Sequence, residues 1–179
     1  MKKILCFLYK CLQCPLAVFS FILVTSITAL SAALLSEIFL GLEPCELCIH
    51  QRWGFFWAAT FAVIGLIFKA RKPIPSIMAV LSGLSFLITG GIAVYHTGVE
   101  QKWWISAVEG CSVPSSFIDG DQNWIDNIMS APSAPCDIIP WQDPIIGLSM
   151  ANYNILLCAG MFVICMTAAL RFKKANISP

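Results

Sequence analysis

The sequence predicts an all-α membrane protein in which four transmembrane helices form one bundle. Hydrophobic residues make up 58% of the 179 residues and charged residues only 12%, whereas an ordinary soluble protein carries about 25% charged residues. A chain of this size cannot bury so much apolar surface in a core of its own. Lipid is therefore the expected solvent for most side chains, and residues 1–179 are expected to form a single membrane domain.

Four apolar stretches approach the roughly 20 residues that a helix needs to cross a bilayer. The first is longer than the apolar part of a cleavable signal, which runs about 7–15 residues, so it is expected to remain as a helix. The second is shorter, and it crosses fully only if it carries His50, Gln51 and Arg52 near one membrane face. The expected helices span residues 15–36, 49–68, 76–95 and 148–170.

The charged residues separate by side of the membrane. Nine of the eleven basic residues lie before the first stretch, between the second and third, or after the fourth, and all ten acidic residues lie in the two loops on the other side. Loops rich in Lys and Arg stay in the cytoplasm. Both termini are therefore expected to be cytoplasmic, with loops 37–48 and 96–147 outside. The chain has no basic tract of the nucleic-acid-binding type, so no nucleic-acid partner is expected.

The second outer loop contains one segment with helical spacing. Trp124, Ile125, Ile128 and Met129 recur on one side of such a helix, between polar residues. A short helix of this kind could lie on the membrane surface. An irregular loop with scattered apolar anchors fits the same residues.

The nine cysteines divide into three groups by their place in the predicted topology. Three on the cytoplasmic side are expected to be reduced thiols, and two inside the fourth stretch are expected to behave as small apolar residues. Only the remaining four face a space in which disulfides persist. The groups are Cys6, Cys11 and Cys14; Cys158 and Cys165; and Cys45, Cys48, Cys111 and Cys136.

Cys45 and Cys48 form a C-x-x-C motif where the chain enters the membrane. A disulfide across two residues constrains little in the unfolded chain, so stability is a poor reason for it. The motif commonly lowers a thiol pKa and favours thiolate chemistry. Zinc is the alternative, but Cys111 and Cys136 lack the paired spacing that four-thiolate sites usually show. Redox chemistry without a metal is therefore the favoured interpretation.

Cys111 and Cys136 lie in the long outer loop. As a purely structural disulfide they would contribute at most about 3–4 kcal/mol. Beside a C-x-x-C on the same side of the membrane, they could instead pass electrons by thiol–disulfide exchange. Because the sequence has no evident haem, flavin or iron–sulfur motif, a quinone dissolved in the membrane is the expected acceptor.

Two polar residues are candidates for contact with such a quinone. Arg52 follows Cys48 by four residues, so the two share a helix face. Its guanidinium could stand beside the thiolate and donate to a quinone oxygen, or it could be an anchor at the membrane interface. His96, just past the third stretch, could be a second polar contact or only a boundary residue.

Several segments resemble the bacterial disulfide bond formation protein B (DsbB) family. Residues 44–52, PCELCIHQR, resemble its first outer loop, in which an arginine follows C-x-L-C by four residues. Residues 96–100, HTGVE, and then Cys111 resemble its second loop. Residues 135–137 followed by 147–151 resemble the approach to its fourth helix. The similarity covers nearly the whole chain, in order.

The resemblance implies an oxidoreductase of the bacterial inner membrane. Such an enzyme reoxidises a periplasmic thioredoxin-like thiol oxidase of the DsbA type and passes the electrons to a membrane quinone, either ubiquinone or menaquinone. The alternative, from another class, is a non-catalytic four-helix membrane scaffold with two structural disulfides. That scaffold would hold a Cys45–Cys48 bond that reductants and quinone leave alone.

The resemblance also implies a role for each outer cysteine. Cys111 would form the mixed disulfide with the partner oxidase. Cys136 would relay to Cys45. Cys48 would reduce the quinone. The implied quinone contacts are Arg52 and His96, and the implied disulfides are Cys45–Cys48 and Cys111–Cys136.

Overall fold

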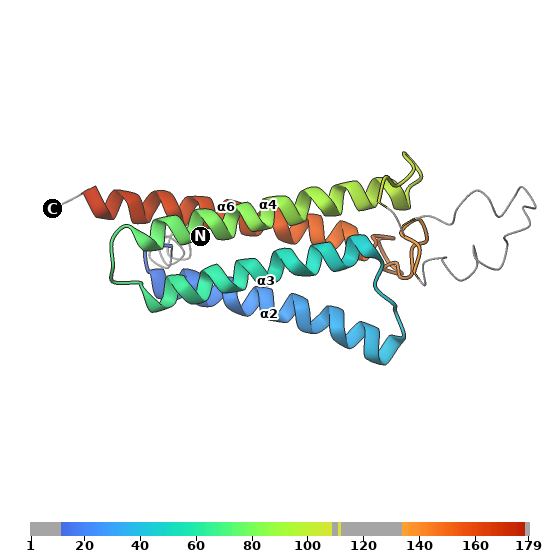
Figure 1. Ribbon diagram of the computed structural model, residues 1–179, viewed down its shortest axis with the longest axis horizontal. Coiled ribbons are helices and arrows are strands. Elements are labelled where there is room, and N and C mark those ends of the chain that lie inside the picture. Colours follow the sequence, from blue (N-terminus) through green and yellow to red (C-terminus); the bar gives the residue numbers. More distant parts are fainter. Residues whose placement is uncertain (1–11, 109–110, 112–133, 178–179) are drawn as a thin grey trace, which may run out of the picture.

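The computed structural model describes residues 12–108, 111 and 134–177. Four long helices run side by side along one axis and form a bundle (Figure 1). Within the described residues there is no strand, and an isolated β-bridge joins Gln142 to Ser149. The predicted all-α bundle is therefore confirmed. The helices are α2 (Pro15–Leu40), α3 (Glu46–Ile67), α4 (Ile74–Glu100) and α6 (Met150–Ile177).

The helices reach further than the apolar stretches that predict them, mainly at the outer end and at the C-terminus. Polar residues end an apolar stretch, but they do not interrupt helical hydrogen bonding. Thus α2 continues to Leu40 and ends where Gly41 adopts a left-handed conformation, φ 63°, which favours glycine. Similarly, α3 begins early because Cys45 caps it. The extra turn of α4 brings Glu100 into the helix, and this residue belongs to the site described below.

Three of the four helices, α2, α4 and α6, are long and apolar enough to cross a membrane by length and composition. The helix that falls short is α3, because its first two turns carry Glu46, His50, Gln51 and Arg52. This helix packs against both α2 and α4, while α4 packs against α6. Of its polar residues, Gln51 and Arg52 contact α6 and α2, whereas Glu46 and His50 are exposed.

Close packing inside the bundle depends on large rings facing small residues. Phe19 and Phe86 are fully buried in the central apolar cluster. The ring of Phe19 lies against Gly65 of α3, where an added Cβ would come within 2.5 Å of the ring. Glycine thus lets α2 and α3 approach closely, as small residues commonly do in membrane helix pairs.

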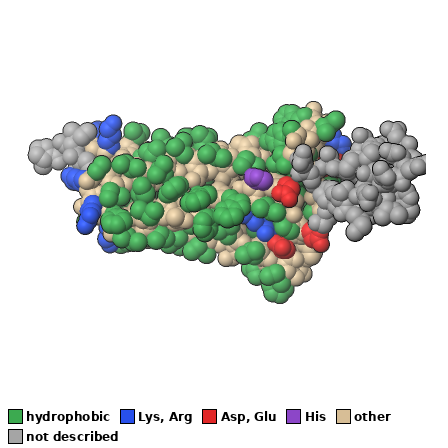
Figure 2. All heavy atoms as spheres, viewed as in Figure 1, with side chains coloured by type: hydrophobic (Ala, Val, Ile, Leu, Met, Phe, Trp, Pro, Cys, Tyr) green, Lys and Arg blue, Asp and Glu red, His purple; other side chains and the backbone are tan. Residues whose placement is uncertain are grey.

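The surface agrees with the predicted separation of charge. On the face shown in Figure 2, hydrophobic side chains cover the length of the bundle. Basic side chains gather at the end that carries the C-terminus, and acidic side chains lie towards the opposite end. The predicted surface helix of the second outer loop (Trp124, Ile125, Ile128 and Met129) lies outside the described residues, as do Cys6 and Cys11.

Candidate redox site

The end of the bundle away from the C-terminus holds the four cysteines that are predicted to lie outside the membrane. Cys111 and Cys136 of the long loop pack against the start of α3 and the end of α4, so that residues distant in sequence share one small buried cluster. Two of the cysteines are completely buried, and a third is only 6% exposed. The cluster consists of Cys45, Leu47, Val99, Cys111 and Cys136, with Cys48 packed against it.

Cys111 and Cys136 are joined by a disulfide bond across 25 residues of chain. The backbone N–H of Cys136 donates to the carbonyl of Cys111 at 2.8 Å. This bond and the disulfide hold residue 111 against the loop segment that begins at residue 134. The described ends of the long loop are thus fixed to each other next to the start of α3.

Cys45 and Cys48 are separate thiols, whereas the family resemblance implies a disulfide between them. Their sulfur atoms lie 2.9 Å apart, well beyond the roughly 2.05 Å of a covalent S–S bond. Cys45 is the N-cap of α3, and its sulfur accepts a hydrogen bond from the backbone N–H of Cys48 at 3.4 Å. This capping geometry brings the thiols together in the first turn of the helix. The structure therefore presents the pair in its dithiol form.

The two thiols differ in their affinity for a proton, and both precede the apolar part of α3. The hydrogen bond that Cys45 donates to the Cys48 sulfur lowers the pKa of Cys48, and the positive charge of Arg52 adds to this effect. The same bond, together with burial, raises the pKa of Cys45. Cys48 is thus the thiolate of the pair and Cys45 the thiol, as suits a nucleophile at a helix N-terminus.

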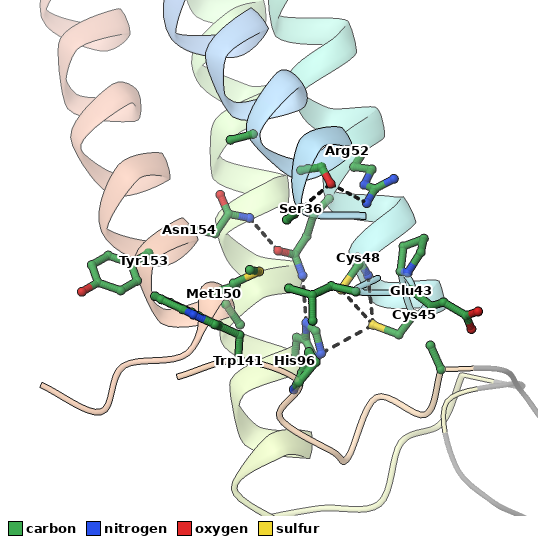
Figure 3. Close-up of a pocket in the computed structure, with 18 of the residues that line it drawn as sticks. Ser36, Glu43, Cys45, Cys48, Arg52, His96, Trp141, Met150, Tyr153 and Asn154 are labelled. Atoms are coloured by element: carbon green, nitrogen blue, oxygen red, sulfur yellow. Dashed lines mark hydrogen bonds between the residues drawn. The ribbon is translucent and has the colours of Figure 1, made fainter. Parts of the chain in front are cut away.

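His96 lies between the two cysteine pairs. Its ring is buried, and Nε2 stands 3.7 Å from the sulfur of Cys45. The backbone of Cys136 also hydrogen-bonds the ring. Figure 3 shows the imidazole beside Cys45, on the side away from the guanidinium of Arg52. The sequence predicts His96 only as a contact for a quinone, whereas the structure also places it against the cysteines themselves.

A chain of two amide side chains reaches the other ring nitrogen of His96. The Nε2 atom of Gln51 lies 3.1 Å from Nδ1 of His96, and Asn154 donates to the Oε1 atom of Gln51 at 2.6 Å. The thiol of Cys158 donates in turn to Asn154 at 3.3 Å. Neither amide is among the predicted site residues. The only signal for Asn154 is a polar amide inside an apolar stretch.

Glu100 is a buried carboxylate one helical turn after His96. Its Oε2 accepts a hydrogen bond from the hydroxyl of Ser149 at 2.6 Å, and its Oε1 lies 3.8 Å from Nε2 of His96. The residue is only 6% exposed. It is not predicted from the sequence either, although the i, i+4 spacing from His96 places both on one helix face.

Arg52 reaches from α3 to α2. Its guanidinium donates to Oε2 of Glu37 at 2.8 Å and to the carbonyl of Ala33 at 3.4 Å. As predicted, Arg52 is close enough to Cys48 for its positive charge to lower the pKa of that thiol. Its carboxylate partner, Glu37, is not predicted from the sequence.

A cavity of about 700 Å³ opens beside these residues, within the range of pockets that hold small organic molecules. The side of α2 that faces it is largely apolar, while Cys48 and Arg52 face it from α3 (Figure 3). A planar ring could thus stand against a thiolate and a cationic donor. Its lining includes Ala29, Leu30, Ala33, Cys48, Arg52, Phe55, His96, Glu100, Asn154 and Leu157.

The same sulfur and nitrogen atoms could in principle hold a metal. One ligand atom each from Cys45, Cys48 and His96 lies within 4.8 Å of the others. A structural zinc site takes four protein ligands, and a catalytic one takes three with an open position. The sequence favours redox chemistry without a metal at these cysteines, and that stays a prediction.

Fold and site together define a helical membrane protein with two cysteine pairs and a histidine buried at one end. Residues 16–168 match the family model described as "Disulfide bond formation protein DsbB". The chain belongs to this family. It is therefore a membrane protein of disulfide bond formation, as its resemblance to the family predicted.

Curated relatives agree with this membership. "Disulfide bond formation protein B" of Xanthomonas oryzae pv. oryzae is 27% identical over 154 residues, covering 83% of this chain and 86% of the relative. The protein of the same name from Cupriavidus metallidurans is 27% identical over 77% of this chain and 82% of its own length. "Uncharacterized protein RP370" of Rickettsia prowazekii is 30% identical over 78% and 80%. No solved structure gives a significant match.

Proposed function

We propose that this protein is a protein-disulfide:quinone oxidoreductase of the bacterial inner membrane. It reoxidises a periplasmic thioredoxin-like thiol oxidase of the DsbA type and delivers the electrons to ubiquinone or menaquinone. One observation carries the proposal. Both outer cysteine pairs share one buried cluster, and the thiolate of that cluster, Cys48, lines a cavity of about 700 Å³.

The relay begins at the disulfide of the long loop. A thiolate of the reduced partner attacks Cys111, which forms the mixed disulfide and releases Cys136. Cys136 then attacks Cys45 of an oxidised Cys45–Cys48 pair, and Cys48 leaves as the thiolate. The second thiol of the partner displaces Cys111 and leaves the partner oxidised. Cys111 then attacks Cys136 and displaces Cys45, which restores the Cys111–Cys136 disulfide and leaves Cys45 and Cys48 reduced. Cys45, Cys111 and Cys136 are buried in one cluster and Cys48 packs against it, which supports this order, because exchange requires direct contact between sulfur atoms.

The relay ends at the cavity. A quinone supplies the capacity to accept two electrons there. Cys48 faces the ring position with its thiolate, and Arg52 offers a charge-assisted hydrogen bond to a ring oxygen. His96 lines the same cavity and holds Cys45 in place.

The function requires the cysteine cluster to face the periplasm, with both termini in the cytoplasm. Nine of eleven basic residues favour that orientation. A membrane-impermeant lysine label should therefore miss Lys72 in intact cells and reach it after the membrane is opened. Labelling of Lys72 from outside intact cells would reverse the orientation and remove the proposed function with it.

The function is tested by adding a reduced C-x-x-C partner and a quinone to the purified protein and following quinone absorbance. We expect steady quinone reduction, and we expect none from the matched variant Cys48→Ser. The scaffold alternative predicts instead that both disulfides survive in the parent protein. It also predicts that quinone absorbance does not change with the parent protein or with Cys48→Ser. That result would overturn the proposal.

A further inference from the structure

Glu100 is a buried acid that the proposed relay does not use. The carboxylate is 6% exposed at the outer end of a membrane helix, where an ionisable residue is costly and is usually functional. Ser149 satisfies one of its oxygens. The other faces His96 and the cavity. The contact with Ser149 alone would be served equally well by an uncharged amide.

A continuous line of polar atoms joins this carboxylate to the reactive thiols. The sulfur atoms of Cys48 and Cys45 are 2.9 Å apart, and Cys45 lies 3.7 Å from Nε2 of His96. The same nitrogen lies 3.8 Å from Oε1 of Glu100. These last two separations are long for proton transfer, but such contacts often tighten when the reacting groups are assembled.

Charge gives a reason for coupling the two ends of this line. Arg52 is already paired with Glu37, so it does not fully offset a second negative charge in the site. A thiolate on Cys48 and a carboxylate on Glu100 repel each other. This repulsion favours a state in which one of the two groups holds a proton over a state in which both are ionised. The other titratable or charged groups that line the cavity are Glu43, Cys45, Arg52, His96 and Tyr153.

We propose that Glu100 stores the proton that Cys48 gives up. The carboxyl group is protonated while Cys45 and Cys48 are reduced, and it is ionised while they are joined as a disulfide. It acts through His96 and is held in place by Ser149. This inference rests on the proposed function, because it concerns the same two thiols.

The proton count closes in both half-reactions. When the disulfide forms, two electrons leave the thiol pair, and Cys45 and Glu100 each release one proton. Reduction of a quinone to a quinol consumes the same two electrons and two protons. When the reduced Cys111–Cys136 pair reduces the Cys45–Cys48 disulfide, two thiol protons are freed. One returns to Cys45 and the other to Glu100, so the site keeps one negative charge throughout.

Infrared difference spectroscopy tests the inference without any quinone. The full chain carrying Cys111→Ser and Cys136→Ser isolates the Cys45–Cys48 pair, which is then reduced chemically. We expect the C=O band of a protonated carboxyl to appear on reduction and to shift in heavy water. The band should be lost in Glu100→Gln, which keeps an oxygen for Ser149 but holds no proton. It should persist in Glu46→Gln, because Glu46 is an exposed residue in the first turn of α3.

Kinetics give a second readout. Glu100→Gln is expected to slow quinone reduction about 10²-fold, a typical loss for one proton-transfer group, and to flatten its pH profile. Mixed-disulfide formation at Cys111 should be unchanged. If Glu100→Gln does not fold, Glu100→Asp keeps a carboxyl and should shift the band.

Two outcomes would overturn the inference: no carboxyl band on reduction, or a band that persists in Glu100→Gln. The band is recorded without quinone, so its failure differs from failure of the proposed function. A protein that shows the band but reduces no quinone would remove the proposed function and leave proton storage by Glu100 in place.

Discussion

Arg52 shows how one side chain can serve both the bundle and the site. Its ion pair with Glu37 joins α3 to α2, yet the residue is partly exposed, and such pairs contribute only about 0–1 kcal/mol to stability. Its position on the cavity wall, one turn after Cys48, matters more for the chemistry. Replacing Arg52 should therefore affect quinone use more than folding.

Arg52→Ala is expected to raise the apparent KM for quinone about ten- to a hundredfold. The reason is the loss of a charge-assisted hydrogen bond worth roughly 1.5–3 kcal/mol. Arg52→Lys should restore only part of this loss, because an ammonium lacks the planar fork of donors. Steady-state kinetics at varied quinone concentration measure both effects. A folded Arg52→Ala protein with the parent KM would show that Arg52 serves only the ion pair between α3 and α2.

The thiolate character of Cys48 can be measured directly. Because its pKa lies below that of an ordinary thiol, its thiolate should persist as the pH falls below the usual thiol range. Alkylation of the reduced protein should accordingly modify Cys48 before Cys45, whose pKa is raised. Mass spectrometry after short alkylation at a series of pH values gives the order. Arg52→Ala should move the Cys48 profile to higher pH, and equal profiles for the two thiols would contradict this assignment.

At the scale of the helices, small residues decide how closely the elements approach. Gly65 of α3 stands against the buried ring of Phe19 on α2. Gly91 of α4 and Gly160 of α6 have nothing within 4 Å of an added Cβ. The three glycines therefore differ in tertiary environment, although each lies within an apolar helix.

Gly65→Ala is expected to destabilise the bundle by about 1–3 kcal/mol, the usual range for overpacking a filled core. Gly91→Ala and Gly160→Ala are the matched controls, and they should be neutral or slightly stabilising because alanine favours a helix. Thermal unfolding in detergent compares the three variants. Equal stabilities for Gly65→Ala and its controls would show that α2 and α3 do not pack as described.

At the scale of the whole molecule, two cysteines of the long loop share one buried cluster with residues of α3 and α4. Its outer disulfide is buried together with Cys45. In the proposed relay, the partner that opens this disulfide also frees a thiol next to the Cys45–Cys48 pair. The proposed electron path is short because the fold brings together cysteines that are far apart in sequence.

Cys136→Ser should accumulate a mixed disulfide between Cys111 and the partner oxidase, because the resolving thiol is missing. Non-reducing gels of such a strain should show an adduct that a reductant removes. The matched variant Cys111→Ser should show none. An adduct that persists in Cys111→Ser and vanishes in Cys136→Ser would exchange the roles of the two cysteines.

By itself, the sequence determined the four-helix bundle, the separation of charge along it and the presence of a C-x-x-C at one end. These features are local, because an apolar stretch, a group of lysines or a pair of cysteines three positions apart can be read within a few residues. Arg52 could be predicted for the same reason, since it lies one turn after Cys48 on the same helix.

Only the tertiary structure decided which polar groups meet. Glu37 with Arg52, Gln51 with Asn154 and Glu100 with Ser149 each join different parts of the chain. Such contacts depend on the distance between packed helices, and the packing of rings against small residues sets that distance. A buried carboxylate and an exposed one look the same in a sequence, because burial depends on what the rest of the fold places around them.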